Sequence, residues 1–249
     1  MDSFNIYMLS DILLPLEVES LIKMLQITPY YHYFIQTSNH VTEWFWKEYF
    51  KCHGYLPEET NLKRALQLRG LHRWCPKKFD YQEFINLKKM DLDNRKISEI
   101  PESLSCLTNL TDLNLNVNKI SKFPESLSRL TNLKRLILSY NQISEIPESL
   151  SRLTNLTWLS LNHNKISEIP ESLSCLTNLT KLSLSFNKIR EIPESLSCLT
   201  NLTWLSLFNN KISEIPESLC CLSNLTSLYL QHNQISEIPD SLKHMHIYI

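Results

Sequence analysis

Glycine is nearly absent from this chain: only two of its 249 residues are glycine. Phosphate-binding loops need several glycines, because their backbone must approach the phosphate closely. Neither a G-x-G-x-x-G nor a G-x-x-x-x-G-K pattern occurs anywhere in the sequence. The sequence therefore predicts no nucleotide-binding loop of these kinds.

An excess of charge of either sign is also missing. The 25 lysines and arginines nearly balance the 26 aspartates and glutamates, so the formal net charge is −1. Proteins that bind nucleic acids or anionic membranes usually carry a clear excess of positive charge. We therefore expect neither a nucleic-acid partner nor a membrane partner.

Long apolar runs are missing as well. The longest apolar stretch, residues 12–16, is far too short to span a bilayer, and residues 1–5 carry no basic region before an apolar core. The seven cysteines are an odd number without a secretory context, which favours free thiols over disulfides. We expect a cytoplasmic protein, with the nucleus as the alternative compartment.

No residue pattern indicates a metal site or a catalytic centre. Cys52, His53, His72 and Cys75 are the nearest approach to a zinc set, but two adjacent ligands followed by a long gap match no usual zinc spacing. Acidic residues such as Glu168 and Glu191 recur along the chain with a lysine three positions before them, which favours a solvated charged edge. We therefore expect no enzyme activity, no cofactor and no metal.

What the sequence does contain is a repeat of constant length. Seven segments begin at Leu87, Leu110, Leu133, Leu156, Leu179, Leu202 and Leu225. Within each segment, apolar positions 4 and 6 alternate with polar positions, which predicts a strand with one buried face. A proline at position 15 suits the first position of a short helical turn, and the following acidic residue suits the dipole of that turn. An asparagine at position 9 of six segments predicts a buried ladder that bonds to loop backbone groups.

The pattern L-x-x-L-x-L-x-x-N-x-I-x-x-I-P-x-x-L-x-x-L runs through residues 87–245 and resembles the intracellular leucine-rich repeats of the Ras-group type. The resemblance implies an α/β fold, a right-handed solenoid shaped like a horseshoe, with a parallel β-sheet on its concave face. We expect this solenoid to cover residues 87–249, and a small all-α domain to precede it.

Most of the variation between segments falls on the strand positions that should face outward, namely positions 3, 5, 7 and 8. Large aromatic side chains gather there, and exposed aromatic patches usually mark protein-binding sites. The alternative is drift on an unused face of recently duplicated repeats. The candidate target-binding residues are Arg135, Tyr140, Trp158, His163, Lys181, Phe186, Trp204, Phe208, Tyr229 and His232.

Residues 57–86 form a more basic connector. Pro57 suits a helix start and Gly70 a helix end, which predicts a helix that caps the N-terminal end of the solenoid. The alternative use of its lysines and arginines is a phosphate-binding or nucleic-acid-binding patch. We favour the cap.

Residues 1–56 are apolar and rich in aromatic residues, and apolar residues follow helical spacing between residues 14 and 25. This alone fits a small helical cap. The sequence of residues 9–52 is more specific than a cap requires. It resembles an F-box domain, which has an opening helix with an L-P-x-E motif and a closing helix that contains a tryptophan. The F-box resemblance implies binding to a Skp-type adaptor of a cullin-based ubiquitin ligase. The residues that would bind the adaptor are Leu14, Pro15, Glu17, Leu21, Ile22, Leu25 and Trp46.

The middle of this segment departs from the F-box pattern. Residues 35–40 read I-Q-T-S-N-H, where the family has a longer stretch similar to Val-Cys-Lys-x-Trp. Proteins that combine a degenerate F-box with near-identical repeats also resemble those encoded by giant DNA viruses of amoebae, which would place the chain in a host cytoplasm. We therefore expect an adaptor that recruits an unknown target protein to the ligase. The alternative is a repeat scaffold for signalling proteins, with no link to ubiquitin.

Overall fold

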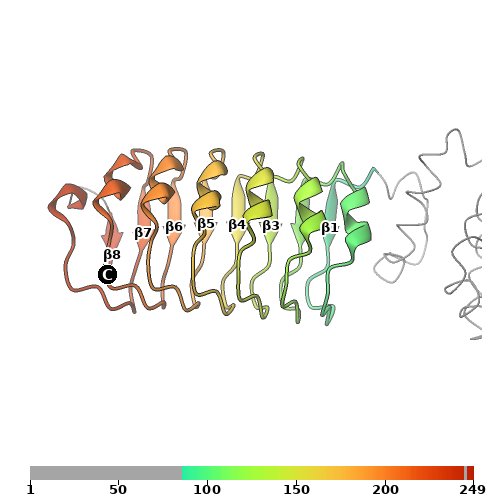
Figure 1. Ribbon diagram of the computed structural model, residues 1–249, viewed down its shortest axis with the longest axis horizontal. Coiled ribbons are helices and arrows are strands. Elements are labelled where there is room, and N and C mark those ends of the chain that lie inside the picture. The colour runs from blue at the N-terminus through green and yellow to red at the C-terminus, as the bar shows by residue number, and fades with distance from the viewer. Residues whose placement is uncertain (1–85, 244–245) are drawn as a thin grey trace, which may run out of the picture. The chain divides into compact units, whose positions relative to one another are not determined.

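The computed structural model describes residues 86–243 and 246–249 (Figure 1). The chain divides into two compact units, Met1–Arg69 and Gly70–Ile249, and all described residues lie in the second unit. The predicted adaptor-binding residues and the predicted capping helix fall outside the described residues. Their assignment, together with that of the first two predicted domains, stays a prediction.

The described part of the chain alternates short strands with short 3-10 helices. The strands are β1 (Lys89–Asp91), β2 (Asp112–Asn114), β3 (Arg135–Ile137), β4 (Trp158–Ser160), β5 (Lys181–Ser183), β6 (Trp204–Ser206), β7 (Ser227–Tyr229) and β8 (Ile247–Tyr248). The 3-10 helices are η2 (Glu102–Cys106), η3 (Glu125–Arg129), η4 (Glu148–Arg152), η5 (Glu171–Cys175), η6 (Glu194–Cys198), η7 (Glu217–Cys221) and η8 (Asp240–Leu242).

The eight strands form one parallel sheet in chain order, which confirms the predicted sheet. Neighbouring strands pair in a register of one full repeat, so Leu136 lies beside Leu159 and Leu159 beside Leu182. The last strand breaks this period, because Leu228 pairs with Ile247, which is nearer along the chain than one full repeat. The seventh repeat thus reaches the sheet after a shorter path through η8, and it adds a strand that the repeat pattern did not predict.

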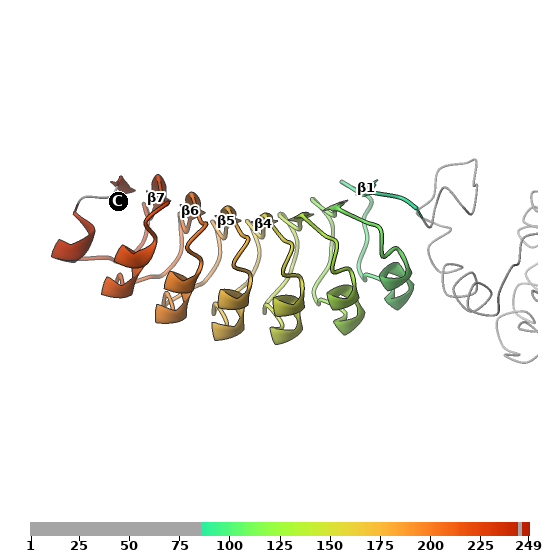
Figure 2. The same ribbon diagram turned by 90° about the horizontal axis from the view of Figure 1, so that it is seen from above.

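The core consists of the repeated leucines and isoleucines between the sheet and the 3-10 helices. Leu136, Leu159, Leu182 and Leu205, at the centres of four successive strands, are all fully buried. Figure 2 shows the strands along one side of the stack and the 3-10 helices along the other. The row of strands is gently curved, with the 3-10 helices on its outer side. Across the described ranges, no helix is both long and apolar enough to cross a membrane. A single repeat could not bury its own apolar face, so stability arises from stacking.

Each proline at position 15 stands immediately before its 3-10 helix. Pro147, for example, has extended backbone angles, and η4 begins at the next residue, Glu148. Pro170 and Glu171 repeat this arrangement in η5. The prediction placed proline in the first turn itself; the structure places it one position earlier, where its fixed φ still suits the entry into the turn.

The asparagines at position 9 form the predicted ladder. Asn164 donates through Nδ2 to the carbonyl oxygens of Leu138 and Leu161, at 3.0 and 3.1 Å. Its Oδ1 accepts a hydrogen bond of 2.9 Å from the backbone N–H of Ile143, in the preceding repeat. Each amide therefore joins two neighbouring repeats through backbone groups that are buried from water.

Position 8 of every repeat adopts a left-handed backbone conformation. The φ angles there lie between 51° and 58°, and the position is occupied by Asn94, Val117, Tyr140, His163, Phe186, Asn209 and His232. Glycine, asparagine and aspartate adopt this conformation most easily, whereas a side chain branched at Cβ is strained in it. The repeats contain no glycine, so large side chains occupy a strained position.

We expect Val117→Asn to raise the free energy of unfolding by about 1 kcal/mol, because asparagine relieves left-handed strain and Val117 is 41% exposed. Urea unfolding followed by circular dichroism measures the change. Tyr140→Asn is the matched control: it should gain less, because Tyr140 also stacks on His163. A Val117→Asn protein that unfolds at lower urea than the natural chain would contradict the strain argument.

Candidate functional site on the strand face

The strand face is the surface made by positions 3, 5, 7 and 8 of the repeats, whose side chains point away from the buried leucines. Strand geometry produces it: in β4, Leu159 is fully buried while its neighbour Trp158 is only half-buried. Because the register is the same from β1 to β7, equivalent side chains lie side by side across the sheet. All ten predicted target-binding residues belong to this face.

An aromatic ladder runs along position 8. The rings of Tyr140 and His163 are stacked with their centroids 4.1 Å apart, and those of His163 and Phe186 with centroids 4.0 Å apart. Phe208, at position 7 of the next repeat, continues the ladder at 5.2 Å from Phe186, and His232 meets Phe208 edge-on at 4.9 Å. Such contacts add about 0.5–1.5 kcal/mol per pair and offset part of the left-handed strain at position 8.

A second aromatic group lies at the C-terminal end of the sheet. The rings of Trp204 and Tyr229 are tilted, with centroids 5.7 Å apart, and Tyr229 stacks on Tyr248 at 4.7 Å. Tyr248 belongs to β8, the strand that the repeat pattern did not predict, so its contribution to the strand face was missed as well.

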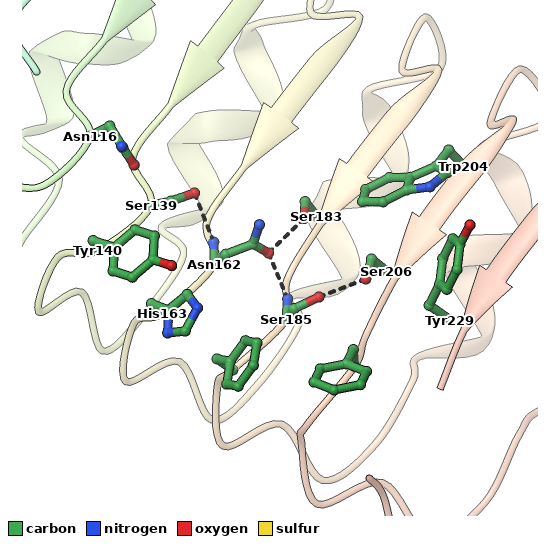
Figure 3. A pocket seen from close by; sticks show the side chains of 12 residues that line it. Asn116, Ser139, Tyr140, Asn162, His163, Ser183, Ser185, Trp204, Ser206 and Tyr229 are labelled. Carbon is green, nitrogen blue, oxygen red and sulfur yellow. Dashed lines mark hydrogen bonds between the residues drawn. The ribbon is translucent and has the colours of Figure 1, made fainter. Parts of the chain in front are cut away.

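Small polar side chains lie between these aromatic groups (Figure 3). Ser139 Oγ and Ser160 Oγ are 2.8 Å apart, and Ser185 Oγ and Ser206 Oγ are 2.6 Å apart. Asn162 Oδ1 accepts hydrogen bonds from Ser183 Oγ at 2.6 Å and from the backbone N–H of Ser185 at 2.8 Å. All these serines are buried, which explains why each has a partner.

Together these side chains form a groove of about 470 Å³ across β3 to β7. The serines and Asn162 make its floor, Tyr140 and His163 lie on one side and Trp204 on the other, with Tyr229 towards the C-terminal end (Figure 3). Phe186 and Phe208 also line the groove. No aspartate, glutamate, lysine or arginine lines it. Burial lowers the pKa of His163 below its usual 6.5, so this side chain is neutral at pH 7. The groove is therefore polar at its floor, aromatic at its walls and uncharged.

Four of the predicted residues lie outside this groove. His232 contacts it only through Phe208. Arg135 and Lys181 are exposed and lie over the ring of Trp158, with Arg135 Cζ 4.2 Å and Lys181 Nζ 5.3 Å from its centroid. Cation–π attraction holds both charges against the indole. Because the two cations lie over its ring, Trp158 holds these charges on the strand face, and its role in target binding stays a prediction.

The predicted aromatic residues are less exposed than their positions alone indicated. Tyr140 and Phe186 are exposed, whereas Trp204, Phe208 and Tyr229 are half-buried, because they pack on one another. The serine floor was missed, although a signal for it existed: Ser160, Ser183 and Ser206 share position 5 in three successive repeats.

A second groove of about 650 Å³ on the described surface has no aromatic lining; Asn86, Lys88, Asn109, Thr111, Asn132, Lys134 and Asn155 line it. Among residues 86–243 and 246–249, no group of three potential ligands could hold a metal ion. Glu145, Glu168 and Glu191, from the recurring acidic positions, are all exposed, as predicted for a solvated edge. In the part of the chain that the structure describes, the thiols of Cys175, Cys198, Cys220 and Cys221 are free and exposed. They lie in η5, η6 and η7, away from the strand face.

Comparisons with known protein families place these features in context. Residues 59–191 match the family model described as a leucine-rich repeat region, and residues 177–235 match the model described as leucine rich repeat. The first match covers more than half of the chain. A comparison with curated proteins gives no match.

Several solved structures are similar to the chain. The ectodomain of the plant membrane receptor kinase GASSHO1/SCHENGEN3 from Arabidopsis thaliana, in complex with CASPARIAN STRIP INTEGRITY FACTOR 2, is 33% identical with a TM-score of 0.61, over 66% of this chain and 20% of that chain. An internalin from Listeria monocytogenes is 29% identical with a TM-score of 0.62, over 75% and 54%. A leucine-rich repeat protein from Leptospira interrogans is 32% identical with a TM-score of 0.57, over 66% and 49%. The chain thus spans between a fifth and about half of the length of these proteins.

Proposed function

Because the chain belongs to the leucine-rich repeat family, we propose that it is a protein–protein interaction adaptor that captures a target protein on its strand face. Leucine-rich repeat domains generally mediate protein–protein interaction, and the similar receptor kinase ectodomain was solved in complex with CASPARIAN STRIP INTEGRITY FACTOR 2. In this proposal the solenoid is a right-handed horseshoe with the target on its concave side, and the chain itself is no enzyme.

The observation that carries this proposal is the groove across β3 to β7. Aromatic side chains at an accessible surface are frequent energetic anchors of protein interfaces, particularly where polar groups with free hydrogen-bonding capacity lie beside them. The side-chain nitrogen Nδ2 of Asn162 donates to none of the described residues, whereas its Oδ1 accepts from Ser183 Oγ and from the backbone N–H of Ser185. The groove therefore combines apolar contact area with an available donor.

We further propose that residues 1–56 act as an F-box that docks on a Skp-type adaptor, through Leu14, Pro15, Glu17, Leu21, Ile22, Leu25 and Trp46. This proposal is supported by the L-P-x-E motif and by the tryptophan in the expected closing helix. These residues lie outside the part of the chain that the structure describes. The chain would then recruit its target to a cullin-type ligase in the cytoplasm, and partner subunits would transfer the ubiquitin. The second candidate is a scaffold for signalling proteins in which residues 1–56 only cap the solenoid; the degenerate middle of the F-box pattern favours this alternative.

We expect the intact chain to co-purify with a Skp-type adaptor, and the double variant Pro15→Ala/Trp46→Ala to lose that binding at least tenfold, because the variant removes two apolar docking side chains. The measurement is co-purification of the two proteins after co-expression. Circular dichroism of the variant must match that of the natural chain, which shows that the repeats remain folded. An intact chain that binds no Skp-type adaptor would exclude the ligase role and leave the scaffold.

A further inference from the structure

We infer that the target binds the strand face through a carboxylate side chain at Arg135 and Lys181, and through an uncharged segment in the adjacent groove. The occupant is an extended stretch of the target polypeptide in which an aspartate or glutamate lies about four residues from an aromatic or aliphatic residue. This inference rests on the proposed function, and it adds the chemistry by which the target is recognised.

The two cations are fixed in place by the sheet. Arg135, Trp158 and Lys181 are register neighbours on β3, β4 and β5, so the indole lies between the two charged side chains. Both cations lie over its ring, at 4.2 and 5.3 Å from the centroid. Such contacts restrict the two side chains before a partner arrives, so less side-chain conformational entropy is lost on binding.

Neither cation has an acidic partner among the described residues. The one ion pair found among them joins Lys243 and Asp240, far along the chain at η8. Asp112 is the register neighbour of Arg135 on β2, but its Oδ2 instead accepts a hydrogen bond of 2.8 Å from Thr111 Oγ1. The guanidinium of Arg135 thus has N–H donors available for a carboxylate, which arginine can bind in a bidentate geometry.

The number of charges favours a protein carboxylate over a polyanion. Nucleic acids are bound by many phosphate contacts at once, whereas this cluster offers two cations in a chain of net charge −1. The groove beside the cluster is uncharged and aromatic. Such a surface suits a polypeptide with one or two acidic residues and an apolar neighbour.

The spacing follows from the sheet. Lys181 and Trp204 are register neighbours, so Arg135 and Trp204 are separated by three strand spacings. Parallel strands lie about 4.8 Å apart, which gives about 14 Å, the length of about four residues of extended chain at roughly 3.3 Å each. A carboxylate at the cation cluster and an apolar side chain against Trp204 can therefore belong to one short segment.

The test uses a phage-displayed library of random dodecapeptides panned on the full-length chain. The best enriched peptide is synthesised, together with a version in which its acidic residues become amides, and both are titrated by fluorescence anisotropy. The proteins are the natural chain, Arg135→Gln/Lys181→Gln, Trp204→Ala, and the matched control Lys188→Gln/Lys211→Gln, which removes two exposed lysines from position 10.

The expected result is enrichment of peptides with an acidic residue about four residues from an apolar one. Arg135→Gln/Lys181→Gln and the amide peptide should each weaken binding about tenfold, a loss that higher salt should reproduce in the natural chain, while the lysine control stays unchanged. Peptides that need Trp204 but bind equally well to Arg135→Gln/Lys181→Gln would overturn the inference and leave the proposed function intact. If the enriched peptides bind every variant with the affinity they have for the natural chain, or if no peptide is enriched, both the inference and the assignment of the strand face would be overturned.

Discussion

Replacing Asn164 by alanine is expected to lower the free energy of unfolding by about 1–3 kcal/mol. The backbone N–H of Ile143 would lose its hydrogen bond to Asn164 Oδ1, in a part of the structure that is closed to water. The carbonyl oxygens of Leu138 and Leu161 would each keep one of two amide donors, because Asn141 and Asn187 also bond to them. The orphaned N–H therefore dominates the loss. Urea unfolding of the two proteins measures it.

The control for this prediction is Asn178→Ala. Asn178 also bonds to the preceding repeat, through Nδ2 to the carbonyl oxygen of Thr154 at 2.9 Å, but it is exposed, so water can replace that bond. We expect a change below about 1 kcal/mol. Equal effects of the two substitutions would show that the ladder adds no more to stability than a surface contact.

Replacing Leu159 by alanine is expected to cost about 3 kcal/mol. Leu159 is fully buried at the centre of β4, between Leu136 and Leu182, and the neighbouring repeats cannot move together to fill the space without breaking the sheet register. The loss combines the transfer of the removed methyl groups with a cavity in the middle of the stack. Thermal and urea unfolding both report it.

The variant Leu159→Ile distinguishes a loss of stability caused by lost side-chain volume from one caused by a changed side-chain shape. Isoleucine has the same number of carbon atoms and suits a strand, so its cost should stay below about 1.5 kcal/mol. If the alanine and isoleucine variants unfolded at the same urea concentration, the cost would come from side-chain shape rather than from the cavity.

The repeat architecture could be predicted from the sequence because it depends on local pattern. A leucine at position 4, a proline at position 15 and an asparagine at position 9 each have one role that recurs in every repeat, and the strand at Leu159, the helix after Pro170 and the bonds of Asn164 all follow it. The eighth strand could not be predicted in this way. Ile247 and Tyr248 follow a shortened repeat, and they pair with β7 because an open sheet edge lies within reach.

The candidate site was predictable only as a set of residues on one face. Sequence position alone treated Trp158 and Trp204 alike, since both occupy position 3. In the structure, Trp158 lies beneath two cations, while Trp204 borders the groove. The difference depends on the neighbours in adjacent strands, which stand a full repeat away in the sequence.

The sequence by itself determined that this chain stacks repeats into a parallel sheet with a buried leucine core, and which side chains lie on the outer face of that sheet. It could do so because hydrophobic period and turn residues act within a single repeat. Only the tertiary structure decided which side chains on that face meet: the stacked rings of Tyr140, His163 and Phe186, the serine floor, and the cations over Trp158. These contacts form between repeats, and their geometry exists only once the strands are in register.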